Sequence, residues 1–133
     1  MTLRTILAVA IGGVLGTAAR LGIDAVLPHP HDVFPWSTLI VNVVGSLALG
    51  FLVARVWPTA PEWLRAGLGA GVLGSFTTFS AVAVAMIELP LATAAVYLAV
   101  SVLLGLVAAL LGLRLGRRGD APSTAAPIDV VNE

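Results

Sequence analysis

Four long apolar segments, separated by short connections, limit the folds that this chain can adopt. They run roughly over Leu3–Leu27, Trp36–Arg55, Trp63–Ile87 and Leu91–Leu113. About 20 residues of helix cross a bilayer, and each segment is long enough to do so. Only 11% of the residues are charged and the mean hydropathy is +1.04, whereas a soluble domain carries about 25% charged residues. The sequence therefore predicts an all-α membrane protein with four transmembrane helices.

The connections and the start of the chain fit this arrangement. Residues 28–35 and 57–63, PHPHDVFP and WPTAPEW, are short and contain proline, as turns between spans do. Arg4 precedes an apolar run, as in a signal peptide, but the run is too long and continues past Arg20 without a small-residue cleavage site. We therefore predict that the first segment is a retained helix.

The arginines are divided unevenly between the two sides of the predicted spans. With four spans, both termini and the central connection lie on one side. That side holds most of the basic residues: Arg4, Arg55, Arg65, Arg114, Arg117 and Arg118. The other side holds at most one arginine and three acidic residues: Arg20, Asp24, Asp32 and Glu88. We expect a multi-pass protein of the cell inner (plasma) membrane, and the positive-inside rule predicts that both termini lie in the cytoplasm. Residues 1–116 then form the transmembrane domain, and the polar residues 117–133 a disordered cytoplasmic tail.

Several classes of function find no support in the sequence. The chain has no cysteine, which excludes disulfides, thiolate metal sites and thiol chemistry. Its net charge is zero and no basic patch is interleaved with aromatic residues, so nucleic-acid binding is not expected. An enzyme is the weakest hypothesis, because the two imidazoles, His29 and His31, lie in a predicted loop without further evident ligands or a nucleophile–base set.

Polar residues inside the predicted spans line up on two helix faces. In the second span the residues spaced by four are Thr38, Asn42 and Ser46; in the fourth they are Thr93, Tyr97, Ser101 and Gly105. An isolated serine or threonine usually hydrogen-bonds a neighbouring helix. An asparagine and two separate stripes instead favour a polar path through the membrane.

Arg20 is the only basic residue well inside a predicted span. An arginine at the centre of a membrane helix costs about 2.5–3.5 kcal/mol. Snorkelling to the interface, a fixed positive charge that favours an anion, and a clamp on broken backbone all stay open. No Asp or Glu lies deep within a span, so the simplest proton-coupled exchange mechanisms lack a proton carrier.

The stretch GAGVLGSFTTFS, residues 69–80, has the GxGxxG spacing of a dinucleotide-binding loop. It lies within an apolar span rather than after a strand, so that interpretation fails. Its glycines and hydroxyl residues predict instead that the third helix is broken near its middle. Such a break is tolerated where it is buried in protein or lines a cavity or ion site, and broken helices mark binding sites in many transport proteins.

Two further glycine pairs have GxxxG spacing, Gly12/Gly16 and Gly67/Gly71. Small residues at this spacing let two helix backbones approach closely. We interpret these pairs as packing positions rather than ligand sites.

Three blocks of the sequence together resemble the signature blocks of the Fluc/CrcB fluoride channels. They are GGVLGTAAR (12–20), STLIVNVVGSLALGF (37–51) and GAGVLGSFTTFS (69–80). The resemblance covers about residues 5–113 and keeps the order and spacing of the blocks. It implies a small four-helix subunit that forms an antiparallel dimer, conducts fluoride passively and selectively, lowers cytoplasmic fluoride and so confers fluoride resistance.

The resemblance also implies a set of ion-pathway residues: Asn42, Phe79, Ser80, Tyr97, Ser101 and Thr38. Asn42 matches the family's pore asparagine, and Phe79 matches a pore phenylalanine whose positive ring edge can face an anion. Tyr97 and Ser101 match a polar track on the last helix. Ser80 and Thr38 add hydroxyls beside Phe79 and on the Asn42 face.

A structural sodium ion at the dimer interface is implied as well. By position, its ligands would be the backbone carbonyls of Gly74 and Thr77, with Arg20 as a structural support nearby. Carbonyl oxygens suit a hard cation.

This chain departs from the family pattern at three positions. The family usually has TTFSTF where residues 77–82 are TTFSAV, so Ala81 replaces a threonine and Val82 the second pore phenylalanine. Gly105 stands where the last-helix track commonly continues with a hydroxyl. A non-conducting structural partner of a heterodimeric channel therefore stays open as an alternative.

The arginine bias bears on the partner. A subunit that inserts in both directions should carry balanced arginines on its two sides, and this one does not. We predict a heterodimer with an oppositely inserted homologue, with a homodimer as the other outcome. A small multidrug exporter is less favoured, because its first helix needs an embedded glutamate where this chain has Arg20 and no acid before Asp24.

Overall fold

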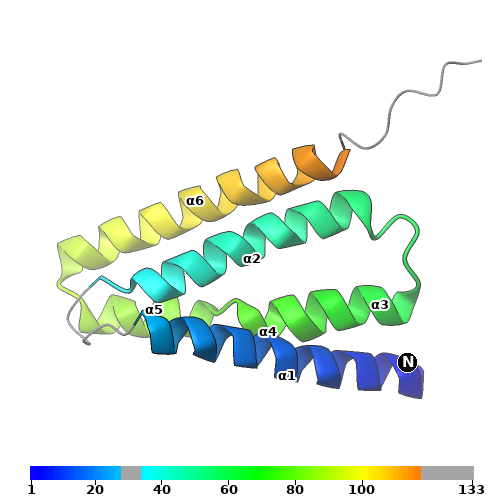
Figure 1. Cartoon of the computed structure of the whole chain (residues 1–133). Coiled ribbons are helices and arrows are strands. Elements are labelled where there is room, and N and C mark those ends of the chain that lie inside the picture. The colour runs from blue at the N-terminus through cyan, green and yellow to red at the C-terminus, as the bar shows by residue number, and fades with distance from the viewer. Residues whose placement is uncertain (28–33, 118–133) are drawn as a thin grey trace, which may run out of the picture.

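The computed structural model describes residues 1–27 and 34–117. Its helices follow in the order α1 (Leu3–Val26), α2 (Trp36–Arg55), α3 (Glu62–Ala66), the π-helix η1 (Gly67–Leu73), α4 (Gly74–Phe76), α5 (Phe79–Glu88) and α6 (Leu91–Arg117). Four helical segments are long and apolar enough to cross a membrane, and α3 to α5 together make the third, Glu62–Glu88. The predicted all-α chain with four membrane-spanning helices is confirmed (Figure 1).

Two predicted regions lie outside the described residues. Residues 28–33 include His29 and His31, and residues 118–133 hold nearly all of the expected tail. The last helix runs to Arg117, further than the predicted end at Leu113. Both the loop and the tail therefore stay predictions.

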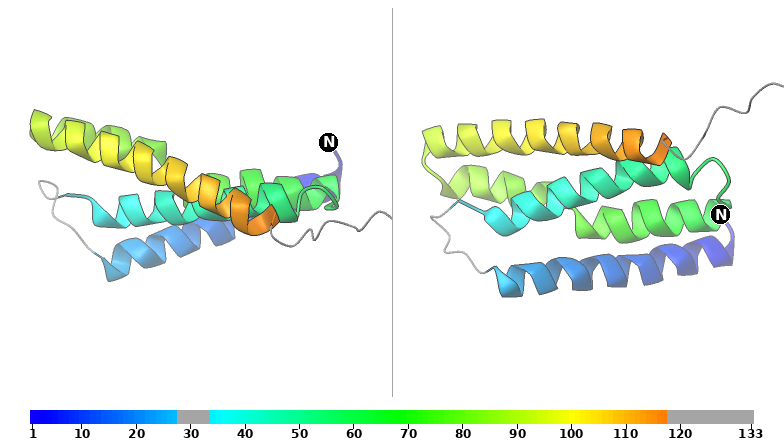
Figure 2. Two further views of the ribbon diagram at one scale, coloured as in Figure 1. Left: turned by 90° about the horizontal axis from the view of Figure 1, so that it is seen from above. Right: turned by 45° about the horizontal axis from the view of Figure 1, so that its top comes forward.

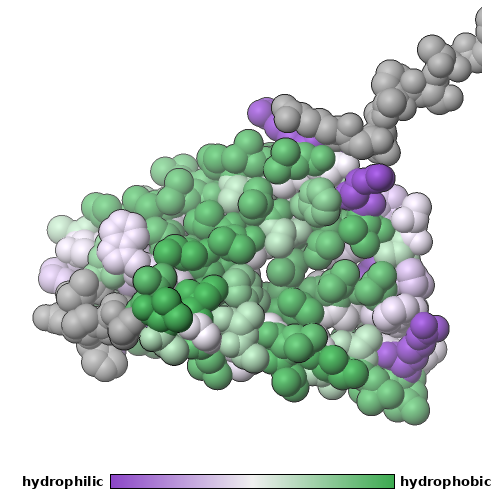
Figure 3. Space-filling view, viewed as in Figure 1, coloured by the Kyte–Doolittle hydropathy of each residue, from purple (hydrophilic) through white to green (hydrophobic). Residues whose placement is uncertain are grey.

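The ends and the flank of the helix bundle differ chemically. The N-terminus, the α2–α3 connection and the end of α6 share one end of the bundle (Figure 1). The Arg4 guanidinium lies there, 4.3 Å from the centre of the Trp63 ring, and this cation–π contact joins α1 to α3. Apolar side chains cover the flank between the ends (Figure 3). Many are well exposed, for example Val14 at 70% and Leu103 at 61%, which suits contact with lipid.

Glycines bring α1 against the first half of the third span. A Cβ added at Gly12 would overlap the carbonyl oxygen of Gly67, and one at Gly16 would overlap that of Val72. A Cβ at Gly71 would lie only 3.1 Å from the Gly12 Cα. The two GxxxG pairs thus face each other, and the predicted close packing is confirmed. The right-hand view of Figure 2 shows the two segments side by side.

The second half of the third span changes neighbours. Whereas η1 and α4 contact α1, α5 contacts α6, which itself packs along α2. A buried cluster forms between α2, α5 and α6: Leu39, Val82, Ala85, Leu89, Ala94 and Tyr97. The residues between α4 and α5 therefore carry the chain from the α1 side of the bundle to the α6 side.

Candidate ion pathway

The backbone of the third span leaves helical geometry after its glycine-rich run. Gly67–Leu73 form η1, and no residue in the described part of the chain has a positive φ. Between α4 and α5, Thr77 (φ −76°, ψ 154°) and Thr78 (φ −146°, ψ 118°) are extended. The glycines thus stay helical, and the extended residues are the two threonines that follow them.

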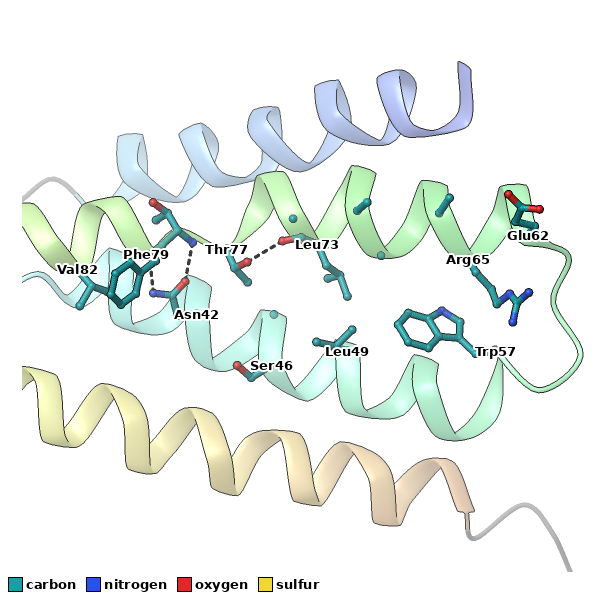
Figure 4. A pocket seen from close by; sticks show the side chains of 16 residues that line it. Asn42, Ser46, Leu49, Trp57, Glu62, Arg65, Leu73, Thr77, Phe79 and Val82 are labelled. Atoms are coloured by element: carbon teal, nitrogen blue, oxygen red, sulfur yellow. Dashed lines mark hydrogen bonds between the residues drawn. The ribbon is translucent and has the colours of Figure 1, made fainter. Parts of the chain in front are cut away.

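The side chain of Asn42 on α2 holds this extended segment. The Thr78 N–H donates to Asn42 Oδ1 at 2.8 Å, and Asn42 Nδ2 donates to the Thr78 carbonyl at 3.0 Å (Figure 4). A primary amide has two N–H donors, and this pair of hydrogen bonds uses only one of the two that Asn42 has. Asn42 therefore fixes the backbone and keeps a donor for another partner.

The same contacts release two backbone carbonyls. In a continuous α-helix the N–H of Thr78 would bond the Gly74 carbonyl, and that of Ala81 would bond the Thr77 carbonyl. Here Thr78 donates to Asn42, and the Ala81 N–H donates to Thr78 Oγ1 at 3.2 Å. Gly74 and Thr77, the expected sodium ligands, thus present carbonyl oxygens outside the helical pattern. The described residues hold no group of three or more His, Cys, Asp and Glu that could bind a metal.

A groove of about 770 Å³ runs between α2 and the third span. Asn42, Thr77 and Phe79 line one part of it, and Trp57 and Arg65 line the part beside the α2–α3 connection (Figure 4). The Phe79 side chain is 79% exposed. The groove therefore joins the Asn42–Thr78 contact to the arginine-bearing end of the bundle.

Two smaller hollows share Arg20. One, of about 350 Å³, is lined in part by Thr38 and Ser80; the other, of about 360 Å³, in part by Gly74, Thr77 and Ser80. The Nε atom of Arg20 is buried without a hydrogen-bond partner among the described residues. Arg20 thus shares a hollow with Gly74 and Thr77, and its Nε–H has no hydrogen-bond partner among the described residues.

Tyr97 and Ser101 line none of these spaces. Tyr97 is fully buried, and its ring packs edge-on against Phe34 with 5.2 Å between ring centres. The Tyr97 hydroxyl and Ser101 Oγ are buried and lack hydrogen-bond partners in the part of the chain that the structure describes. The structure thus brings Asn42 together with Phe79, and Thr38 with Ser80, but it places the last-helix pair inside the subunit.

Some residues of the site were not predicted from the sequence. Thr78 provides the backbone partners of Asn42 and caps α5 by accepting from Ala81. A hydroxyl residue just before a helix is a recognisable N-cap signal. Trp57 and Arg65 line the groove only because a turn brings α3 back along α2, which no local pattern indicates.

Comparison with known proteins identifies what this chain resembles as a whole. A family model described as CrcB-like protein, Camphor Resistance (CrcB), matches residues 7–113. The Fluoride-specific ion channel FluC of Rhodospirillum centenum is 46% identical over 127 residues, which cover 90% of this chain and 100% of that protein.

Two further relatives show the same extent of similarity. The Fluoride-specific ion channel FluC of Paracoccus denitrificans is 43% identical over 117 residues, covering 85% of this chain and 94% of the relative. Fluoride-specific ion channel FluC 1 of Leifsonia xyli is 43% identical over 134 residues, covering 96% and 97%. The similarity extends over all four spans rather than over one motif.

Proposed function

This chain belongs to the CrcB-like family, and we propose that it is a subunit of a fluoride-selective channel that exports cytoplasmic fluoride and so confers fluoride resistance. The family is one of ion channels, and the chain is not an enzyme. Relatives named fluoride-specific ion channel match this chain over nearly their whole length.

The observation that carries the proposal is the Asn42–Thr78 contact within the groove. A small anion that leaves water needs close donors in place of its hydration shell. The second N–H of Asn42 is such a donor, and the exposed ring of Phe79 offers a positive edge beside it. These groups are neutral, so they can bind an anion weakly enough to let it move on.

Export needs no energy source beyond the membrane potential. An interior-negative membrane supplies about 2.3 kcal/mol per 100 mV for each exiting monovalent anion. Arg65 lies in the groove at the end that we assign to the cytoplasm. A positive charge at that mouth raises the local concentration of anions before they reach the neutral donors.

We further propose that a structural sodium ion binds the carbonyls of Gly74 and Thr77. The diversion of the Thr78 and Ala81 amides to side chains supports this assignment, because it leaves both carbonyls without their helical partners. A bound cation would interact favourably with the partial negative charge of these two oxygens. Arg20, which shares a hollow with both residues, would support the same backbone from α1.

The conducting unit, in this proposal, is an antiparallel dimer. A second subunit would cover the exposed Phe79 and the open side of the groove. The gathering of arginines at one end supports a fixed orientation with cytoplasmic termini, and therefore an oppositely inserted homologue as the partner. A homodimer is the alternative.

Fluoride efflux from liposomes tests the channel. The purified chain is reconstituted alone, and with an oppositely inserted homologue, into vesicles loaded with potassium fluoride, and valinomycin starts electrically balanced efflux that a fluoride electrode follows. We expect fluoride to leave and chloride to stay. Efflux from the chain alone would rule out an obligate partner. Absence of efflux in both preparations would contradict the channel and favour a non-conducting structural role.

Reporter fusions test the orientation. A reporter that is active only in the cytoplasm and one that is active only outside it are fused in turn to the C-terminus. We expect signal from the cytoplasmic reporter alone. Equal signals from the two would contradict the fixed orientation and, with it, the need for a separate partner.

A further inference from the structure

The two polar stripes of the chain meet at Ser46 on α2 and Gly105 on α6. Ser46 follows Asn42 by one turn, and Gly105 follows Ser101 by one turn. A Cβ built on Gly105 would lie 3.5 Å from Ser46 Oγ. Figure 4 shows Ser46 on the side of α2 that is turned toward α6. The hydroxyl of Ser46 therefore lies opposite Gly105, where α6 has no side chain.

Gly105 is not required for close packing of the two helices. A Cβ at Gly112 would overlap the Leu47 carbonyl oxygen, and one at Gly50 would overlap that of Ala109. At Gly105 the nearest neighbour is the Ser46 hydroxyl, at an ordinary contact distance. The backbones thus leave room for a side chain at Gly105, and the nearest group in that space is the Ser46 hydroxyl.

The Ser46 hydroxyl is free to act on an ion. Ser46 lines the groove together with Asn42. Among the described residues the Ser46 hydroxyl has no hydrogen-bond partner. Ser101 Oγ also lacks a partner but is fully buried, whereas Ser46 Oγ is not. A serine in a membrane helix often bonds the carbonyl four residues earlier, and Ser46 makes no such bond here.

Resting on the proposed channel function, we propose that Ser46 is an anion-binding residue of the pathway and supplies, from α2, the hydroxyl that Gly105 lacks on α6. An exiting ion would pass from the Arg65 end of the groove to the Ser46 hydroxyl and then to the Asn42 donor, one turn further along α2. In this arrangement α2 provides the polar groups of the groove at the level where α6 has a glycine.

Moving the hydroxyl between the two helices tests this assignment. Four proteins are compared by fluoride efflux from liposomes: the wild type, S46A, the double variant S46A/G105S, and T59A. Thr59 provides the control for loss of a hydroxyl, because it is exposed in the α2–α3 connection and lines none of the three spaces described above. Size-exclusion chromatography confirms that each variant keeps the wild-type assembly.

We expect S46A to slow fluoride efflux by about tenfold, the effect of losing one hydrogen bond to a charged group. The double variant should recover to within about threefold of the wild type, because a serine at 105 returns a hydroxyl to the same gap. T59A should match the wild type.

Three results would overturn the assignment or its basis. Efflux by S46A equal to that of T59A would show that the Ser46 hydroxyl has no role in conduction. A slow S46A that G105S does not rescue would assign Ser46 a role in helix packing instead. A wild-type chain that carries no fluoride, alone or with an oppositely inserted homologue, would overturn the channel proposal itself.

Discussion

Asn42 and Thr78, which are 36 residues apart in the chain, share two hydrogen bonds that use both backbone groups of Thr78. This pairing explains why extended residues are tolerated within an apolar span. Each unpaired backbone group in a membrane costs several kcal/mol, and one side-chain amide satisfies two of them. Asn42 is therefore a structural residue as well as a candidate ion contact.

Replacing Asn42 with alanine should weaken both the fold and the pathway. Thr78 would lose the partners of its N–H and carbonyl, so we expect a loss of about 1–3 kcal/mol of stability and at least about tenfold slower fluoride efflux. Thermal unfolding in detergent and liposome efflux measure the two effects. L103A, a change on the exposed flank of α6, is the control. Equal efflux from N42A and L103A would exclude Asn42 from the pathway.

The sequence predicted those features that depend on local composition. The four spans follow from hydropathy, and close packing at Gly12 and at Gly67 follows from the GxxxG pairs to which they belong, although the spacing does not say that the two pairs meet. The pairing of Asn42 with Thr78 could not be predicted in this way, because it depends on how α2 lies against the third span. The burial of Tyr97 likewise depends on tertiary packing, because α5 brings Val82 to the ring and the residues before α2 bring Phe34.

Val82 stands where the resemblance leads one to expect a second pore phenylalanine, and it is buried, at 5% exposure, against Tyr97 and its neighbours. A phenylalanine there would overpack the cluster, so we expect V82F to lose about 1–3 kcal/mol of stability without faster efflux. I87F is the control, since Ile87 is 86% exposed on the same helix and lines none of the described spaces. A stable V82F protein with faster efflux would show instead that the valine limits conduction.

Replacing Phe79, unlike replacing Val82, should change fluoride efflux without lowering the stability of the subunit. The Phe79 side chain is 79% exposed in the subunit, so F79I should change the stability of the subunit by no more than about 0.5 kcal/mol. Efflux should nevertheless fall, because isoleucine has no positive ring edge. F51I on α2, at a phenylalanine that is 41% exposed, controls for the loss of an aromatic ring. The hypothesis fails if F79I and F51I conduct alike.

Sodium should stabilise the folded protein if the Gly74 and Thr77 carbonyls bind it. A ligand that binds only the folded state raises stability in proportion to the logarithm of its concentration above Kd. We therefore expect the unfolding temperature to rise with the logarithm of the sodium concentration above Kd, when sodium replaces choline at constant ionic strength. Potassium, a larger ion, should replace it less well. An unfolding temperature independent of sodium would remove the ion from the proposal.

Gly16 and Gly22 lie on the same helix, α1, and differ in their surroundings. A Cβ at Gly16 would overlap the Val72 carbonyl oxygen, whereas one at Gly22 would meet nothing within 4 Å. G16A should therefore force α1 away from η1 and cost about 1–3 kcal/mol. G22A should be neutral or gain up to about 1 kcal/mol, the helix preference of alanine over glycine. Thermal unfolding of the two variants in the same detergent measures the difference. Because α1 also carries Arg20 to the hollow beside Gly74 and Thr77, G16A should weaken the response to sodium as well, and G22A should leave it unchanged. Equal stability of the two variants would mean that α1 does not pack on the third span through its glycines.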